Sequence, residues 1–119
     1  MVDDNHTALT VHKAIVSRFG HGVVPFDSPV DAMHFFEDEY ESIDLIITDY
    51  RMPEMNGLQL LQNIQALGIN IPAIILTGYP DEVDGAGAEL CGAHILGKPI
   101  RINCLIEQIS SLSSGTCLA

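Results

Sequence analysis

Short runs of apolar residues alternate along the chain with longer stretches in which apolar residues recur every three or four positions. A short, unbroken apolar run predicts a strand that is buried on both faces, as in a parallel sheet. The predicted strands are residues 45–49, 72–77 and 93–97, with shorter ones at 1–2 and 23–26. Pro25 places the strand at 23–26 at the edge of the sheet, because proline donates no ladder hydrogen bond.

Helical spacing of the apolar residues fills the intervals between these runs. The predicted helices are residues 7–19, 29–41, 57–67, 81–91 and 102–112. In the first helix the buried stripe is predicted to consist of Ala8, Val11, His12, Ile15 and Phe19. The helix at 81–91 should be the loosest, because its two glycines each cost about 1 kcal/mol relative to alanine.

Five alternations of strand and helix within 119 residues predict one α/β domain. Right-handed crossovers then give a doubly wound parallel sheet with helices on both faces. We expect a flavodoxin-like (βα)5 fold with strand order 2-1-3-4-5 and an unusually short first strand. The domain should span residues 1–113, and the small polar residues 114–119 predict a short, frayed C-terminal tail. Three or four apolar residues added before Met1 should lengthen the first strand and stabilise the protein.

Composition and charge narrow the classes of function. The formal net charge of −11 argues against direct binding of nucleic acid. No apolar run approaches the ~18 residues of a membrane span, and no signal peptide opens the sequence. The odd number of cysteines, 3, with no CxxC pair, favours reduced thiols in a cytoplasm over a disulfide framework. We therefore expect a cytoplasmic protein whose partners are proteins or cations.

Polar residues follow the predicted strands where each strand ends: Asp3 and Asp4, Asp49, Thr77 and Lys98. The carboxyl ends of parallel strands share one edge of a sheet, where open α/β sheets bind their ligands. Crowded carboxylates repel one another, and a hard cation such as Mg²⁺ can offset that repulsion. A lysine and a hydroxyl add groups suited to a phosphoryl oxygen. Together these groups are what transfer of a phosphoryl group to an aspartate requires.

Four pieces of the sequence resemble the receiver domain of bacterial two-component response regulators: Asp3-Asp4-Asn5, Asp49-Tyr50-Arg51-Met52-Pro53 with Gly57, Thr77-Gly78 and Lys98-Pro99. The resemblance covers nearly the whole chain, and its pieces stand in the family's order. It implies that Asp49 accepts a phosphoryl group from the phosphohistidine of a sensor histidine kinase or a histidine phosphotransfer protein. Such a domain is a signalling phosphoacceptor and not an enzyme acting on other molecules.

The resemblance also implies a role for each neighbour of Asp49. Asp4 would bind Mg²⁺ directly and Asp3 mainly through water, and the backbone carbonyl of Arg51 would complete the protein ligands together with Asp49. Thr77 and Lys98 would contact the phosphoryl group. The Lys98–Pro99 peptide bond would be cis, a geometry almost confined to proline.

Two features depart from the family pattern. The acidic pair is preceded by only two residues, and Ile95 stands where the family usually carries a tyrosine or phenylalanine that acts as a switch. A β-branched side chain is stiff at its first torsion and has no polar tip. We therefore expect phosphorylation to act mainly through residues 81–91, with modest change at Ile95. The face formed by the fourth helix, the last strand and the last helix could still support a homodimer.

Three alternative interpretations compete with this one. An aspartate-nucleophile phosphohydrolase generally has a second acid two residues after the nucleophile, where Arg51 stands here. A degenerate receiver that serves only as a protein-binding module is kept open by Ile95, although no acidic, threonine or lysine position is missing. A histidine metal site lacks ligand spacing among His6, His12, His21, His34 and His94.

Overall fold

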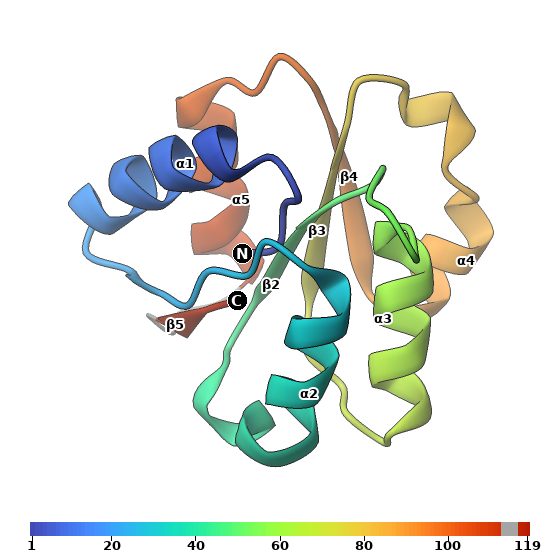
Figure 1. The fold of residues 1–119 in the computed structure, drawn as a ribbon. Helices are drawn as coiled ribbons and strands as arrows, with labels where there is room; N and C mark the ends of the chain where they lie inside the picture. Colours follow the sequence, from blue (N-terminus) through green and yellow to red (C-terminus); the bar gives the residue numbers. More distant parts are fainter. Residues whose placement is uncertain (113–116) are drawn as a thin grey trace.

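The computed structural model describes residues 1–112 and 117–119 of the chain and forms a parallel sheet between two layers of helices (Figure 1). The helices are α1 (His6–Arg18), α2 (Pro29–Glu39), α3 (Gly57–Ala66), α4 (Gly85–Leu90) and α5 (Ile102–Leu112), with 3₁₀ turns at Tyr40–Ser42 and Pro80–Glu82. The strands are β1 (Gly22–Val23), β2 (Ile46–Asp49), β3 (Ala73–Thr77), β4 (Ala93–Gly97) and β5 (Cys117–Leu118). The expected doubly wound α/β architecture is confirmed.

The pairing of the strands confirms the expected order across the sheet. β2 pairs in parallel with β3, and β3 pairs in parallel with β4. On the other side of β2, Val2 bridges both Thr48 and Phe26, so the start of the chain lies between β2 and the segment that begins with β1. The first predicted strand is indeed a stub, because Val2 is its one bridging residue among those described.

The end of the chain corrects the expectation of a frayed tail. Residues 114–116 of the predicted tail lie outside the described residues, but Cys117–Leu118 form β5, which pairs in parallel with β1. Leu118 and Ala119 are fully buried, so this part of the tail is not frayed. β5 occupies the same strand position as Met1 and Val2, between β1 and β2, and the two chain ends lie close together (Figure 1). An apolar extension before Met1 would therefore have to displace Cys117–Ala119, and its effect on stability stays a prediction.

The amino group of Met1 is buried in this arrangement. Met1 is 2% exposed, and its amino group donates a hydrogen bond to the Val24 carbonyl at 2.9 Å. Burial lowers the pKa of this amino group to about 4, against a smaller opposing effect of Cys117. The group is therefore neutral at pH 7 in the folded protein, and folding releases its proton.

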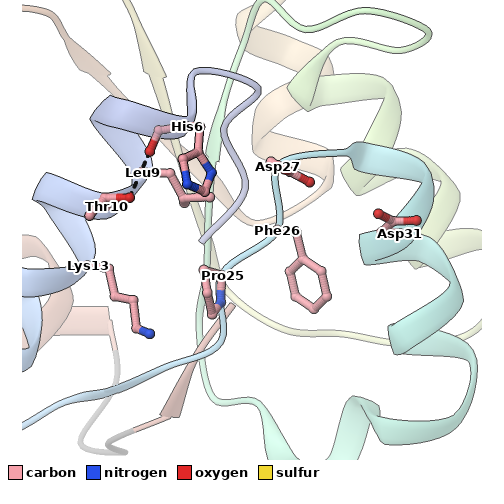
Figure 2. A pocket seen from close by; sticks show the side chains of 8 residues that line it. All are labelled: His6, Leu9, Thr10, Lys13, Pro25, Phe26, Asp27 and Asp31. Carbon is pink, nitrogen blue, oxygen red and sulfur yellow. Dashed lines mark hydrogen bonds between the residues drawn. The ribbon is translucent and has the colours of Figure 1, made fainter.

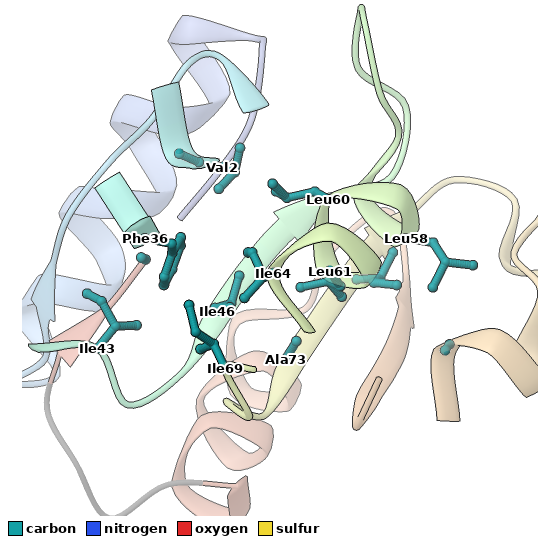
Figure 3. Close-up of a cluster of buried hydrophobic side chains, with 14 of the residues drawn as sticks. Val2, Phe36, Ile43, Ile46, Leu58, Leu60, Leu61, Ile64, Ile69 and Ala73 are labelled. Atoms are coloured by element: carbon teal, nitrogen blue, oxygen red, sulfur yellow. The ribbon is translucent and has the colours of Figure 1, made fainter. Parts of the chain in front are cut away.

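Two apolar clusters cover the two faces of the sheet. One joins the sheet to α2, α3 and α4 through buried residues that include Phe36, Ile46, Leu61 and Ile64 (Figure 3). The other joins it to α1 and α5 through Leu9, Val16, Leu105 and Ile109. Burial of both faces explains why β2 and β3 read as continuous apolar runs, since every residue of these strands is buried.

The buried stripe of α1 differs from the predicted one. Leu9 and Val16, seven residues apart and so two helical turns apart, are the buried residues of this helix. Val11 and Phe19, which were expected in the stripe, are 49% and 52% exposed. The spacing of apolar residues allowed two neighbouring stripes, and α1 packs with the smaller set against the sheet.

Local signals place the helix that follows the Asp49 strand. Asn56 and Gln59 form a capping box at the start of α3, each side chain accepting a hydrogen bond from the other residue's backbone N–H. Gly57 donates its backbone N–H to the Tyr50 carbonyl at 2.7 Å, and a Cβ at Gly57 would lie 2.4 Å from the Asp49 carbonyl oxygen. Only glycine therefore lets α3 begin this close to Asp49.

None of the helices in the described residues has both the length and the apolar character needed to cross a lipid bilayer.

Gly57→Ala should lower the free energy of unfolding by roughly 1–3 kcal/mol, because the added methyl group forces α3 away from the backbone of Asp49. Gly85→Ala is the matched control: a Cβ there meets no atom within 4 Å, and the substitution within α4 should be neutral or stabilising by up to about 1 kcal/mol. Urea unfolding of both variants measures the difference. Equal stabilities would show that the close approach at Gly57 carries no cost.

Candidate functional site

The topology of the sheet brings the predicted polar residues to one edge. Asp3 directly follows the Val2 bridge, Asp49 is the last residue of β2 and Thr77 is the last residue of β3. Lys98 directly follows β4, and its backbone N–H donates to the Thr77 carbonyl at 2.7 Å. These residues lie at the carboxyl ends of neighbouring parallel strands, as the sequence predicts.

Three carboxylates meet at this edge. Asp3, Asp4 and Asp49 each offer a carboxylate oxygen within 4.8 Å of the other two. Asp3 is 4% exposed and Asp49 is 7% exposed, whereas Asp4 is exposed to solvent. The Lys98 ammonium lies 2.5 Å from a carboxylate oxygen of Asp49. Among the described residues, Lys98 is thus the one cation that forms an ion pair with any of the three carboxylates, and two of these carboxylates are buried.

The electrostatics of Asp3 reflect this excess of negative charge. Burial is the largest cause that raises the pKa of Asp3, and the negative charges of Asp49 and Asp4 raise it further. The Asn5 backbone N–H, which donates to Asp3 at 2.9 Å, and the charge of Lys98 lower this pKa in part. Three crowded carboxylates whose negative charge is only partly offset are a donor set that fits a hard divalent cation such as Mg²⁺.

A second set of polar contacts surrounds Thr77. Its buried hydroxyl donates a hydrogen bond to a Glu82 carboxylate oxygen at 3.2 Å and accepts one from the Tyr79 backbone N–H at 3.1 Å. Glu82 also forms an ion pair with the Arg51 guanidinium, with Nε lying 3.0 and 3.1 Å from the two carboxylate oxygens. Hydrogen bonds from Arg51 are the main cause that lowers the pKa of Glu82. The Arg51 guanidinium also lies over the Tyr79 ring, 5.0 Å from its centroid.

Glu82 and Tyr79 are the site residues that the sequence reasoning did not single out. Glu82 stood in a weakly helical, acidic stretch in which nothing distinguished it from Asp81. Its contact with Arg51 joins residues 31 positions apart, and no periodicity reports such a pair. Only the fold, which sets the loop after β2 beside the loop after β3, could reveal it.

The two remaining predicted positions lie beside the site. The Lys98–Pro99 peptide bond is cis, as the resemblance implies. Ile95 lies in the middle of β4, opposite Ile75 of β3, and is partly buried against the apolar cluster beneath α3 and α4. Its side chain therefore belongs to the apolar core, and it lies on the strand next to the one that ends at Thr77.

A neighbouring pocket of about 360 Å³ lies between α1 and α2 (Figure 2). His6, Leu9, Thr10 and Lys13 line it from α1, and Asp31 lines it from α2. Pro25, Phe26 and Asp27 line it from the segment between β1 and α2. None of the three clustered aspartates is among these residues, so the pocket is separate from the polar edge.

Comparison with known proteins gives a consistent result. The family model of the response regulator receiver domain matches residues 1–110. The transcriptional regulatory protein FixJ of Rhizobium meliloti is 40% identical over 114 residues, which are 95% of this chain and 55% of FixJ. A putative two-component response regulator of Arabidopsis thaliana, ARR21, is 34% identical over 101 residues, or 84% of this chain and 16% of that protein. The chain thus spans about half or less of the length of these relatives.

Solved structures agree with the sequence comparisons. A response regulator receiver domain protein from Clostridium thermocellum has a TM-score of 0.85 and 30% identity, over 93% of this chain and 89% of that chain. The crystal structure of FixJ-N has a TM-score of 0.80 and 32% identity, over 92% of this chain and 86% of that chain.

In metal-free protein at pH 7, Asp3→Asn should raise the free energy of unfolding by roughly 1 kcal/mol. The folded-state pKa of Asp3 is raised, so its ionisation costs stability as the pH rises through that pKa, and the cost is absent below the unfolded value of 3.8. The advantage of the variant should therefore vanish in acid. Asp4→Asn, which alters an exposed carboxylate, is the control and should change metal-free stability little. Thermal unfolding with and without Mg²⁺ should show a smaller Mg²⁺-dependent gain in both variants. A less stable metal-free Asp3→Asn protein would contradict this account.

Proposed function

The chain belongs to the response regulator receiver domain family, and on this premise we propose that Asp49 accepts a phosphoryl group from a phosphohistidine of a sensor histidine kinase or a histidine phosphotransfer protein. A carboxylate oxygen of Asp49 attacks the phosphorus, the phosphorus–nitrogen bond breaks, and the imidazole leaves with the electron pair. The single observation that carries the proposal is the position of Asp49, within reach of two further carboxylates and in contact with Lys98.

We assign the neighbouring residues the following roles. Asp4 would bind Mg²⁺ directly and Asp3 mainly through water, and the Asp49 carboxylate and the Arg51 backbone carbonyl would be the remaining protein ligands. When bound, Mg²⁺ supplies positive charge that offsets the charge of the phosphoryl oxygens. Lys98 already contacts Asp49 and supplies a second cation for the phosphoryl group. Thr77 supplies a hydroxyl donor from the end of the neighbouring strand.

The same observations weigh against the alternatives. A module that only binds proteins has no need of three crowded carboxylates beside a lysine, an arrangement that costs stability. A phosphohydrolase would need a second acid two residues after Asp49, and the side chain at that position is the guanidinium of Arg51, held by Glu82. The proposed role is therefore a self-directed phosphoacceptor and not an enzyme that acts on other substrates.

Partners and location extend the proposal. A cytoplasmic location fits the free thiols Cys91, Cys104 and Cys117. The face formed by α4, β4 and α5 is a candidate surface for a homodimer, and the excess of acidic residues disfavours direct contact with nucleic acid. The division into a receiver domain at residues 1–113 and a tail at 114–119 stays a prediction.

We further propose that the hydroxyl of Thr77 reports phosphorylation through Glu82. The hydroxyl points to Glu82, in the 3₁₀ turn that precedes α4. If the hydroxyl turns toward a phosphoryl group on Asp49, Glu82 loses that hydrogen bond, and the Arg51–Glu82 pair and the turn can rearrange. Ile95 has no polar group with which to take part. The response should therefore concentrate in residues 79–91.

Asp49→Asn should abolish acid-stable, base-labile labelling by a small phosphodonor in the presence of Mg²⁺, because the amide has no nucleophilic carboxylate. Asp38→Asn alters an exposed aspartate on α2 and is the matched control. Intact-mass measurement should find the added phosphoryl group on the parent protein and the control only. Persistent labelling of the Asp49 variant would refute the assignment, and an unlabelled parent protein would favour the binding-only module.

Amide hydrogen exchange with and without a beryllofluoride-type phosphoryl mimic tests the path through Glu82. We expect changes in residues 79–91 and little change at Ile95. Glu82→Gln should reproduce part of the change without the mimic, because it removes the ion pair with Arg51. Glu89→Gln, on the exposed side of α4, is the control and should not. Strong new protection centred on Ile95, without change in residues 79–91, would show that the signal takes another path.

A further inference from the structure

The two ends of the chain share one strand of the sheet. Ile47 of β2 donates its N–H to the Ala119 carbonyl at 2.6 Å and accepts at its own carbonyl from the Val2 N–H at 2.7 Å. In a parallel ladder, a residue that bonds to two residues of the neighbouring strand lies opposite the residue between them. Ile47 bonds to Ala119 and to Val2, so Met1 takes the position between them and lies opposite Ile47. The register thus passes from Ala119 to Met1 as it would between consecutive residues of one strand.

The flanking segment on the other side repeats this pattern. Val24 donates its N–H to the Leu118 carbonyl at 2.8 Å and accepts at its carbonyl from the Met1 amino group at 2.9 Å. Two independent ladders therefore fix the same order, from Cys117 to Ala119 and then from Met1 to Asp3. The strand that lies between β1 and β2 is thus a composite of both ends of the chain, which lie close together in Figure 1.

Several contacts hold the C-terminal half of this strand. The Ala119 N–H donates to the Leu45 carbonyl at 2.9 Å, and the Asp44 N–H donates to the Cys117 carbonyl at 2.9 Å. The Cys117 N–H donates to the Asp44 carboxylate at 3.3 Å. Leu118 is fully buried in the cluster that also contains Met1. Loss of this segment would leave backbone groups of both flanking strands unpaired and would open the cluster beside Met1.

We propose that Cys117–Ala119 is a positioning element of the phosphoacceptor site. It completes the strand between β1 and β2, and through Met1 and Val2 it holds Asp3 and Asp4 in register beside Asp49. The role in the site rests on the proposed function, whereas the shared strand rests on the hydrogen-bond register alone. The C-terminal segment touches neither Asp3 nor Asp49 in the described ladders, so its effect on metal binding passes through the short segment Met1–Asp3.

Leu118→Asp tests the proposal, because a carboxylate cannot stay in the buried position and expels the segment. The variant should bind Mg²⁺ about tenfold more weakly or worse, as expected when support of a ligand is lost. Ile64→Ala removes buried side-chain volume from α3 in the other apolar cluster and is the control for lost stability. At a temperature where both variants are folded, the control should bind Mg²⁺ like the parent protein. Equal weakening in both would show that only stability is at stake.

A chain extended by Val-Leu-Ile before Met1 provides the second test, and its hydrogen-exchange measurement does not depend on the folding of the Leu118 variant. The extension can take the position of Cys117–Ala119, so the Ala119 amide should exchange faster while those of Val24 and Ile47 stay protected. The extension should also restore Mg²⁺ affinity to Leu118→Asp. An Ala119 amide that is unprotected in the parent protein would overturn the shared strand. Failure of the parent protein to accept a phosphoryl group would instead refute the proposed function and leave the exchange result standing.

Discussion

The structure depends on a concentration of negative charge that the fold itself creates. Parallel strands deliver Asp3, Asp4 and Asp49 to one edge, and Lys98 is the one cation that forms an ion pair with them among the described residues. The raised pKa of Asp3 shows that burial and its neighbours disfavour its ionised form. A protein selected for stability alone would not keep such a cluster. The unfavourable electrostatics are explained if the edge is a site for a cation and for a phosphoryl group that the cation and Lys98 together neutralise.

The surrounding scaffold keeps these groups close despite their repulsion. Gly57 allows α3 to begin against the backbone of Asp49, and the ladder hydrogen bonds of Val2 hold the acidic pair beside β2. That ladder is short at the start of the chain and is continued by Ala119 from the end of the chain. The acidic pair therefore follows a strand to which both ends of the chain contribute.

The fold was predictable from local patterns wherever those patterns were unambiguous. The apolar runs that became β2 and β3 end in Asp49 and Thr77, and the order of these residues on the sheet follows from topology rules alone. The stripe of α1 was not predictable, because two sets of apolar residues share its surface and only packing chooses between them. The contacts of Glu82 with Thr77 and Arg51 were not predictable, and neither was the bridge between Leu118 and Leu45. The Arg51–Glu82 pair and the Leu118 bridge join residues that lie far apart in the sequence. A two-residue strand such as β5 carries no periodicity from which it could have been recognised.

The most direct test of the phosphoacceptor account is a crystal structure of the protein with Mg²⁺ and beryllofluoride. The account predicts the ion among Asp3, Asp4 and Asp49, with the beryllium on a carboxylate oxygen of Asp49 and the Lys98 ammonium against a fluorine. It also predicts that the Thr77 hydroxyl has left Glu82 for the fluorine shell. An ion bound elsewhere would contradict the account. So would beryllofluoride on another residue, with Asp49 unmodified and still paired with Lys98.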